Sequence, residues 1–309
     1  MSTNRHTQVT QTVGQSKMSE SLRQGDVLEV LKTIESESVD MVFADPPFNV
    51  GIKYAGEASN DDRADYPEWC AAWISECFRV LKPTGTFYLM TITRHLEHLY
   101  PSMKAHGVFI NQVNWRNVAS TNSKRCFWNE YQPILVYGKT DQYKFHYLAQ
   151  TRKTEWVRFG GYSTGPKGQM LDYWNDIPFV YAGSITHPEA ILKSGTNSKA
   201  HPAQMPVALP ERAILFSTDE GDTVLDPFNG SGTTGEASMK HNRNFIGIER
   251  EAEYVELSLN RWAKARLSPT FFTPAQHSVQ RTAIAASQQA QLFTDGNLPS
   301  KARGATRRR

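Results

Sequence analysis

The sequence lacks any apolar run long enough to cross a lipid bilayer, for which a helix needs about 20 consecutive apolar residues. Residues 1–14 are polar and contain no hydrophobic stretch of the kind that a secretory signal requires. Cysteine is scarce, with three residues among 309, and so small and odd a number cannot form a disulfide framework. These absences predict a protein of a reducing compartment with no membrane segment.

Two kinds of catalytic group are also missing. The nine histidines do not pair at the spacing of metal ligands, so we predict no metal site. No Pro-Cys dipeptide occurs, and none of Cys70, Cys77 and Cys126 lies in a turn suited to a nucleophile. Covalent catalysis through a thiol is therefore not expected.

The net charge of +3 is distributed unevenly along the chain. Residues 263–309 hold eight lysines and arginines but a single acidic residue, Asp295. Because this end is polar and mostly without helical periodicity, we predict a disordered basic tail over residues 267–309. The tail is either a solvated end or an arm that binds phosphates without sequence preference. Residues 1–20 are also predicted to be disordered.

Between these ends the chain alternates short apolar runs with helical patterns. This alternation predicts an α/β fold with a mostly parallel twisted sheet and helices on both faces. The expected strands cover residues 21–23, 39–44, 86–90, 108–118, 131–137, 223–225 and 244–248. The expected helices cover residues 27–35, 67–81, 95–106, 206–217, 234–241 and 252–265.

Two segments interrupt the alternation. Residues 49–65 form a long connection without periodicity, which is typical of a functional flap. Residues 139–200 are irregular, and we predict an insertion or a second domain there. The basic and aromatic side chains of this insertion are Lys139, Lys144, Arg152, Lys153, Arg158, Lys167, Lys193, Lys199, Trp156, Tyr162, Tyr173 and Trp174.

A glycine-rich turn joins the strand at 223–225 to the helix that follows it. The turn reads Asp226-Pro227-Phe228-Asn229-Gly230-Ser231-Gly232-Thr233-Thr234-Gly235. Glycines let the backbone approach a ligand closely, and the carboxyl ends of strands are where open α/β sheets bind ligands. Glu249 ends the next strand, where an acidic side chain can accept hydrogen bonds from ribose hydroxyls. The two features together indicate a nucleoside cofactor.

The turn leaves two cofactors to be weighed. Its glycines have the G-x-G-x-x-G spacing of a dinucleotide loop, so a nicotinamide-dependent oxidoreductase is one candidate. A carboxylate at Asp226, at the start of the turn, suits a ligand with an ammonium group better than a diphosphate. S-adenosylmethionine, which carries an α-amino group, a ribose and an adenine, is therefore the favoured cofactor.

A second motif, Asp45-Pro46-Pro47-Phe48, follows the expected strand at 39–44. The two prolines fix the backbone, so that the Asp45 carboxylate and a nearby carbonyl project in set directions beside the Phe48 ring. Two acceptors next to an aromatic face suit a planar ring that bears an exocyclic amine. Hydrogen bonds to both amine protons favour a pyramidal nitrogen, whose lone pair can attack a sulfonium methyl group.

With these motifs the chain resembles the amino-group DNA methyltransferases, over about residues 21–265. The resemblance is carried by D-P-P-F at 45–48, by D-P-F-x-G-x-G at 226–232 and by His201-Pro202-Ala203-Gln204-Met205-Pro206. The catalytic tetrapeptide precedes the cofactor glycines, which is similar to the beta group of these enzymes. The resemblance implies a Rossmann-like methyltransferase fold with circularly permuted motifs. It places a catalytic half at 21–138, a target-recognition region at 139–200 and a cofactor-binding half at 201–266.

The family pattern also implies roles for individual residues. Asp45 and the Pro46 carbonyl would bind the target amine, with Pro47 in the same rigid turn and Phe48 stacked on a flipped base. Asp226 would contact the methionine amino group, Glu249 the ribose and Asp26 the adenine. The other residues expected at the cofactor are Phe228, Asn229, Gly230, Ser231, Gly232, Thr233, His201 and Gln204. The usual H-P-T-Q-K-P has Ala203 and Met205 here, so a hydroxyl and a lysine charge are missing.

The resemblance implies direct methyl transfer to the N6 amine of adenine in double-stranded DNA, because an aspartate in this tetrapeptide usually accompanies adenine methylation. Transfer to N4 of cytosine is the main alternative. An RNA amino-methyltransferase, a nicotinamide-dependent oxidoreductase and a non-catalytic DNA-binding module are more remote. The target base must leave the duplex to be reached. Residues Lys139–Lys199 are the expected DNA-binding region, which would read base edges and contact phosphates.

The expected partners follow from the same resemblance. DNA is the substrate, no membrane is involved, and a homodimer and a companion restriction endonuclease both remain open. We expect a cytoplasmic protein of a prokaryotic cell or a phage.

Overall fold

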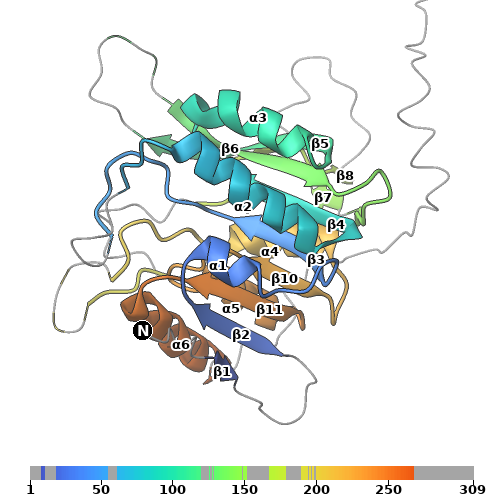
Figure 1. Cartoon of the computed structure of the whole chain (residues 1–309). Coiled ribbons are helices and arrows are strands. Elements are labelled where there is room, and N and C mark those ends of the chain that lie inside the picture. The colour runs from blue at the N-terminus through green and yellow to red at the C-terminus, as the bar shows by residue number, and fades with distance from the viewer. Residues whose placement is uncertain are drawn as a thin grey trace, which may run out of the picture.

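The computed structural model describes residues 8–10, 19–54, 61–119, 125, 127, 129–147, 149–151, 167–178, 189–193, 195, 197 and 200–267. These residues form a nine-stranded sheet covered by helices and a separate two-stranded sheet (Figure 1). The expected α/β fold is confirmed.

The large sheet has a parallel centre and mixed edges. Its strands are β1 (Gln8–Thr10), β2 (Glu20–Gln24), β3 (Val39–Ala44), β4 (Leu81–Met90), β5 (Val108–Ala119), β6 (Asn129–Gly138), β9 (Tyr173–Trp174), β10 (Thr223–Asp226) and β11 (Asn244–Glu249). Their order is β1-β2-β11-β10-β3-β4-β6-β5-β9, and β2, β11, β10, β3 and β4 pair in parallel. The small sheet pairs β7 (Ala149–Thr151) with β8 (Lys167–Gln169).

Helices cover both faces of the large sheet. They are α1 (Val27–Leu31), α2 (Tyr66–Val80), α3 (Leu96–Lys104), α4 (Ala208–Ser217), α5 (Thr233–Lys240) and α6 (Ala252–Leu267), with a short 3₁₀ helix, η1, at Thr93–His95. One core cluster contains side chains of α1, α2 and α3, which lie in front of the sheet in Figure 1. The second cluster contains side chains of α4, α5 and α6.

The central strand β3 supplies both clusters, with side chains that alternate from Met41 to Ala44. All six residues of β3 are buried, because both faces of this strand are covered. Val42 and Ala44 lie in the cluster under α1–α3, whereas Met41 and Phe43 lie in the cluster under α4–α6. The continuous apolar run at 39–44 is therefore a parallel strand between two helical layers, as its composition predicts.

The expected elements are present, with small shifts at their ends. The helix expected over 27–35 ends at Leu31, because Thr33 and Ile34 donate to carbonyls three residues back and tighten the chain into turns. The strand expected over 86–90 begins at Leu81 instead, so that Pro83, Thr84 and Gly85 lie inside β4. Val39 pairs with Leu81 and Met41 with Thr86, so the extra residues of β4 form an irregularity in the ladder.

The insertion expected over 139–200 is less separate than the sequence indicates. Among its described residues, β9 pairs with β5, and Trp174 is buried in the core of the large sheet. The start of the segment packs at the amino-terminal end of the parallel strands: Lys139 Nζ donates to Glu37 Oε1 and to the Leu81 carbonyl.

Two lysines of the expected DNA-binding region, Lys139 and Lys144, bind acidic side chains of the protein itself. Lys144 pairs with Asp219 and Asp222 just before β10 begins. This end of the sheet is opposite to the carboxyl ends of the strands, where α/β sheets bind ligands. Lys139 and Lys144 are thus engaged in ion pairs within the protein, and the DNA-binding role expected of residues Lys139–Lys199 stays a prediction. Residues 152–166, which hold much of its charge, lie outside the described residues.

The ends of the chain also differ from expectation. Residues 8–10 form β1, which pairs antiparallel with β2, although residues 1–20 were expected to be disordered. Val9 and Thr10 are β-branched, and β2 would otherwise be the open edge of the sheet. The expected basic tail lies outside the described residues beyond Leu267. Among the helices that the structure describes, none is long and apolar enough to span a membrane.

We expect Phe87→Ala to lower the free energy of unfolding by about 3–5 kcal/mol, because it opens a cavity in a fully buried position of β4. The matched control is Phe127→Ala, at a phenylalanine that is 98% exposed, with an expected change within about 0.5 kcal/mol. Chemical denaturation of both variants measures the difference. Equal losses would contradict the placement of β4 at the centre of the core.

Candidate active site

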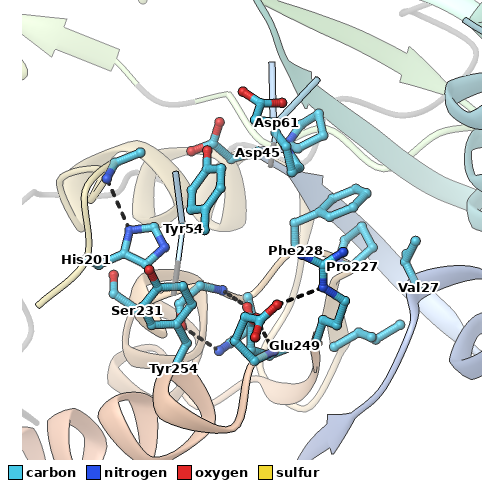
Figure 2. Close-up of a pocket in the computed structure, with 18 of the residues that line it drawn as sticks. Val27, Asp45, Tyr54, Asp61, His201, Pro227, Phe228, Ser231, Glu249 and Tyr254 are labelled. Carbon is cyan, nitrogen blue, oxygen red and sulfur yellow. Dashed lines mark hydrogen bonds and ion pairs between the residues drawn. The ribbon is translucent and has the colours of Figure 1, made fainter. Parts of the chain in front are cut away.

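A cleft opens at the carboxyl ends of β2, β3, β10 and β11 (Figure 2). β10 and β3 are parallel neighbours although far apart in sequence, and the strands that follow them in the chain, β11 and β4, are added to the sheet on opposite sides of this pair. Such switch points are where open α/β sheets bind ligands, since the loops on either side leave in opposite directions. Here the Asp45 turn leaves β3 and the glycine-rich turn leaves β10, and both line the cleft.

The glycine-rich turn is shaped by close packing. Gly230 has a φ of 51°, and a Cβ there would meet His201 Nε2 at 3.1 Å. Gly232 has a φ of 79°, and a Cβ there would meet the Ser258 and Trp262 side chains of α6 at 2.8 Å. Trp262 Nε1 also donates to the Gly232 carbonyl at 2.7 Å. Gly230 therefore faces the cleft, whereas Gly232 lets α6 close against the turn.

Asp226 organises this turn from beneath. It is fully buried, and its two carboxylate oxygens accept from the Phe228 backbone N–H at 2.9 Å and from Thr234 Oγ1 at 2.6 Å. Burial raises the pKa of Asp226 to about 6. Asp226 is not among the residues that line the cleft, in contrast to the direct ligand contact expected of it.

Glu249 lines the cleft at the end of β11 and holds the turn in place. Its Oε2 accepts from the Gly230 N–H, and its Oε1 accepts from the Glu251 N–H, both at 2.8 Å. Burial, together with the charges of Glu251 and Asp226, raises the pKa of Glu249 to about 7, although its hydrogen bonds from the Glu251 and Gly230 N–H groups lower it. A carboxylate has about four acceptor positions, so each oxygen keeps a lone pair for a ligand hydroxyl.

Asp26 lies beside Glu249 at the mouth of the cleft. It caps α1, accepting from the Leu28 N–H at 2.9 Å through one oxygen. The Gly25 N–H donates to the Glu249 carbonyl at 2.9 Å, which fixes the ends of β2 and β11 to each other. The structure thus brings Asp26 and Glu249 together on one wall, as expected.

Side chains from neighbouring elements contact the backbone carbonyls of the Asp45 turn and hold it in place. Tyr66 Oη donates to the Pro47 carbonyl at 2.8 Å, and His95 Nε2 lies 2.7 Å from the Phe48 carbonyl. Arg94 donates to the Asn49 carbonyl at 2.6 Å. In this run, the Pro46 carbonyl is the one without a hydrogen-bond partner among the described residues. It is also the carbonyl expected to bind an amine.

The backbone N–H groups after the turn are bound to a buried carboxylate. Asp61 accepts from the Asn49 N–H at 2.5 Å and from the Val50 N–H at 3.0 Å. Asn49 has a φ of 54°, which the fixed turn imposes. The connection at 49–65 is therefore tied at both ends; its tip, residues 55–60, lies outside the described residues.

Asp45 lines the cleft, near Asp61 and Tyr54 in Figure 2. Burial raises the pKa of Asp45 well above its ordinary value, and the charge of Asp226 raises it further. No hydrogen bond to its carboxylate is made within the part of the chain described. The Tyr54 ring lies near the Asp45 carboxylate in Figure 2. Burial and the Asp45 charge raise the pKa of Tyr54.

Aromatic rings form one wall of the cleft. Phe228 meets Trp69 and Trp73 edge to face, with ring centroids 5.6 and 5.0 Å apart. Phe48 lines the cleft and packs against the core cluster under α4–α6. These surfaces suit flat, apolar ring systems.

The segment at 201–206 closes the opposite wall. His201 lies against Gly230 and contacts Tyr254 edge to face at 4.5 Å. Gln204 does not line the cleft: its amide accepts from the Ile191 N–H and donates to the Glu189 carbonyl. Two residues of this segment were expected at the cofactor. His201 lines the cleft, whereas Gln204 supports its wall from outside.

Several cleft residues carry no local motif in the sequence. Tyr54, Asp61, Tyr66, Trp69 and Tyr254 line the cleft from three separate segments. They were not identified from the sequence, because each reaches the cleft through the packing of its helix or loop. Within the described ranges, no group of histidines, cysteines and carboxylates is arranged to hold a metal ion.

Comparison with known proteins gives close relatives of similar length. The "DNA adenine methyltransferase YhdJ" of Escherichia coli is 34% identical over 246 residues, which cover 77% of this chain and 80% of the relative. The "Type II methyltransferase M.HpaI" of Haemophilus parainfluenzae is 30% identical over 256 residues, which cover 82% of this chain and 76% of the relative.

Solved structures share the fold. M1.HpyAVI in complex with SAM has a TM-score of 0.53 and 24% identity, covering 78% of this chain and 98% of that one. The cytosine-N4-specific PvuII DNA methyltransferase has a TM-score of 0.55 and 18% identity, and the match covers 91% of this chain and 95% of that one. A family model described as DNA methylase, of the N6/N4 methyltransferases, matches residues 39–260. The chain belongs to this family of DNA methylases.

Proposed function

We propose that the protein transfers a methyl group from S-adenosylmethionine to the N6 amine of adenine in double-stranded DNA. The observation that carries this proposal is the juxtaposition of Asp45 and the unpartnered Pro46 carbonyl with the Glu249 wall of one cleft. An amine held by two acceptors at one end and a nucleoside held at the other end lie within a single crevice.

The amine end is supplied by the Asp45 turn. The Asp45 carboxylate and the Pro46 carbonyl would each accept one amine hydrogen, while Phe48 stacks on the ring. Acceptors for both hydrogens leave the nitrogen lone pair free to point along the cleft. After transfer, the surplus proton on nitrogen passes to the Asp45 carboxylate, whose raised pKa suits a proton acceptor.

The cofactor end fits the residues that line it. Glu249 offers acceptor lone pairs to ribose hydroxyls, Asp26 lies beside it, and the Phe228 ring gives an apolar surface for adenine. When bound, S-adenosylmethionine supplies an electrophilic methyl group on a positively charged sulfur. The three acidic groups Asp45, Asp226 and Glu249 give the cleft a negative field that attracts such a cation.

A thiol intermediate is disfavoured by the two described cysteines. Burial raises the pKa of Cys70 to about 12 and the pKa of Cys77 well above its ordinary value. Neither forms a thiolate near neutral pH, and Cys126 lies outside the described residues. Direct transfer without a covalent enzyme intermediate remains the proposed chemistry.

Adenine is favoured over cytosine by relatedness and by the tetrapeptide. A relative with 34% identity is named as an adenine methyltransferase, whereas the structural likeness to a cytosine-N4 enzyme has 18% identity and bears on the fold alone. The aspartate at position 45 agrees with the family pattern for adenine. The described part of the insertion, with Tyr173 exposed, would belong to a target-recognition region. A homodimer, a companion endonuclease and a cytoplasmic location stay predictions.

The direct test is incubation with labelled S-adenosylmethionine and unmethylated double-stranded DNA, followed by mass spectrometry of the nucleosides. We expect N6-methyl-2′-deoxyadenosine, lost in Asp45→Ala and reduced by about 100-fold or more in Asp45→Asn, which places a donor against the amine. Asp62→Ala, at an exposed aspartate of the 49–65 connection, is the control and should keep activity. N4-methylcytosine as product would overturn the assignment of the base.

Cofactor affinity should rise with pH through about 7, the pKa of Glu249. Its ionised form accepts from the ribose hydroxyls, and a protonated group below the pKa loses about tenfold in affinity per pH unit. Calorimetric titration between pH 6 and 8.5 measures the effect. Glu249→Gln should bind weakly with little pH dependence, whereas Glu251→Gln should move the midpoint to lower pH by removing a neighbouring charge. A flat profile for the unaltered protein would contradict the role of Glu249.

Tyr66→Phe should lower kcat by about tenfold, because it removes one hydrogen bond that holds the Pro47 carbonyl. The KM for cofactor should change little, since the Glu249 wall is untouched. Tyr100→Phe removes a comparable hydrogen bond, to Gln112 Oε1 at 2.6 Å, and is the matched control. Equal effects of the two substitutions would indicate general destabilisation instead of bracing.

A further inference from the structure

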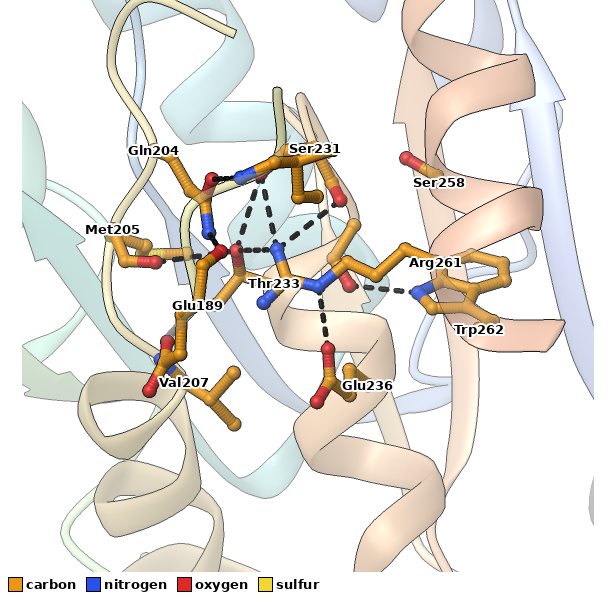
Figure 3. Close-up of polar contacts among 12 residues, drawn as sticks. Glu189, Gln204, Met205, Val207, Ser231, Thr233, Glu236, Ser258, Arg261 and Trp262 are labelled. Carbon is orange, nitrogen blue, oxygen red and sulfur yellow. Dashed lines mark hydrogen bonds and ion pairs between the residues drawn. The ribbon is translucent and has the colours of Figure 1, made fainter. Parts of the chain in front are cut away.

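Arg261 of α6 is buried beneath the glycine-rich turn (Figure 3). Its Nη1 donates to Thr233 Oγ1 at 2.8 Å, and to the carbonyl and hydroxyl oxygens of Ser231 at 3.3 Å each. Its Nε donates to Glu236 Oε2 at 2.5 Å. Arg261 does not line the cleft itself, whereas Ser231 and Thr233 do.

The position of this cation is unfavourable for the helix alone. Thr233 begins α5, and a positive charge near the amino-terminal end of a helix opposes the helix dipole. Glu236, in the first turn of α5, offsets the charge of Arg261. A buried guanidinium kept at this end of a helix requires another reason than helix stability.

The wall next to Thr233 has no cation of its own. A ligand with its nucleoside at Glu249 and its reactive group at Asp45 has one wall left for the rest of the molecule, formed by Ala203, Met205, Ser231 and Thr233. None of these four side chains is charged. An anionic ligand group placed there would meet the amino-terminal end of α5 and two hydroxyls.

Arg261 sets the direction of these hydroxyls. Because Thr233 Oγ1 accepts from Arg261, its own proton must go to another acceptor. The described oxygens within reach of that proton are the Met205 carbonyl at 3.4 Å and Ser231 Oγ at 3.3 Å, and both distances are long for a hydroxyl donor. The proton is thus available to a stronger acceptor in the cleft, such as a carboxylate.

We infer that Arg261 is a positioning residue for the carboxylate of the amino-acid part of the cofactor. It polarises Thr233 and Ser231 so that their hydroxyls donate into the cleft, and its positive charge lies behind them. Glu236 holds the guanidinium in register. This inference rests on the proposed binding of S-adenosylmethionine and assigns one end of that ligand to one wall.

The test compares two ligands that differ only in this carboxylate: S-adenosylmethionine and its decarboxylated form. The dissociation constants of both are measured calorimetrically for the unaltered protein, Arg261→Met and Thr233→Val. We expect the unaltered protein to prefer the carboxylated ligand by about tenfold or more, and each variant to lose about tenfold of that preference. Binding of the decarboxylated ligand should change little.

The matched control is Arg266→Met, which removes an arginine of the same helix that pairs with Glu20 away from the cleft. It should keep the full ligand preference. If Arg261→Met does not fold, Thr233→Val carries the test, because it keeps shape and burial. Parallel weakening of both ligands, or equal binding of both by the unaltered protein, would overturn the role of Arg261. Failure of the unaltered protein to bind either ligand would overturn the proposed function itself.

Discussion

The parallel pairing of β10 with β3 is the constraint on which the site depends. Val224 pairs with Met41 and Leu225 with Val42, although more than half of the chain separates the two strands. Because the strands run in the same direction, the turns that follow them leave at the same edge of the sheet. The catalytic tetrapeptide and the cofactor glycines can therefore be far apart in sequence, in either order, and still line one cleft.

This arrangement brings three acidic side chains, Asp45, Asp226 and Glu249, together in and beneath the cleft. Burial raises the pKa values of Asp45, Asp226 and Glu249, and repulsion from the Asp226 charge raises the values of the other two. Keeping three carboxylates together in a low-dielectric cleft opposes folding when they are ionised. A positively charged ligand relieves that repulsion and favours the ionised forms. The same charges would oppose a dinucleotide with its pyrophosphate, which separates the methyltransferase from the oxidoreductase on electrostatic grounds.

The sequence predicts what lies within a continuous motif. The buried strand at 39–44, the Asp45 tetrapeptide, the glycine-rich turn and Glu249 could all be assigned, because local composition and spacing decide them. Groups whose partners come from distant segments could not. Tyr66 and Asp61 bind backbone groups in and just after the tetrapeptide, from α2 and from the segment before it. Asp226 accepts hydrogen bonds within its own turn. Lys139 and Lys144 pair with acidic side chains at the opposite end of the sheet. The ion pairs of those two lysines could not be predicted from the sequence, because their acidic partners lie in distant segments.

The turns that line the cleft are fixed by side chains of the surrounding helices, while the cleft itself stays open to ligands. Several of the polar groups that face a ligand are carboxylates, hydroxyls and backbone carbonyls, and longer polar side chains on α2, η1 and α6 fix their positions. A flipped base and a cofactor must both enter and leave, so donors and acceptors in the cleft must be free while their directions stay fixed. Bracing by Tyr66, His95 and Arg261 meets both demands. Substitutions of His95 and Arg261, which do not line the cleft, can therefore change catalysis and ligand selection without removing any atom that touches a ligand.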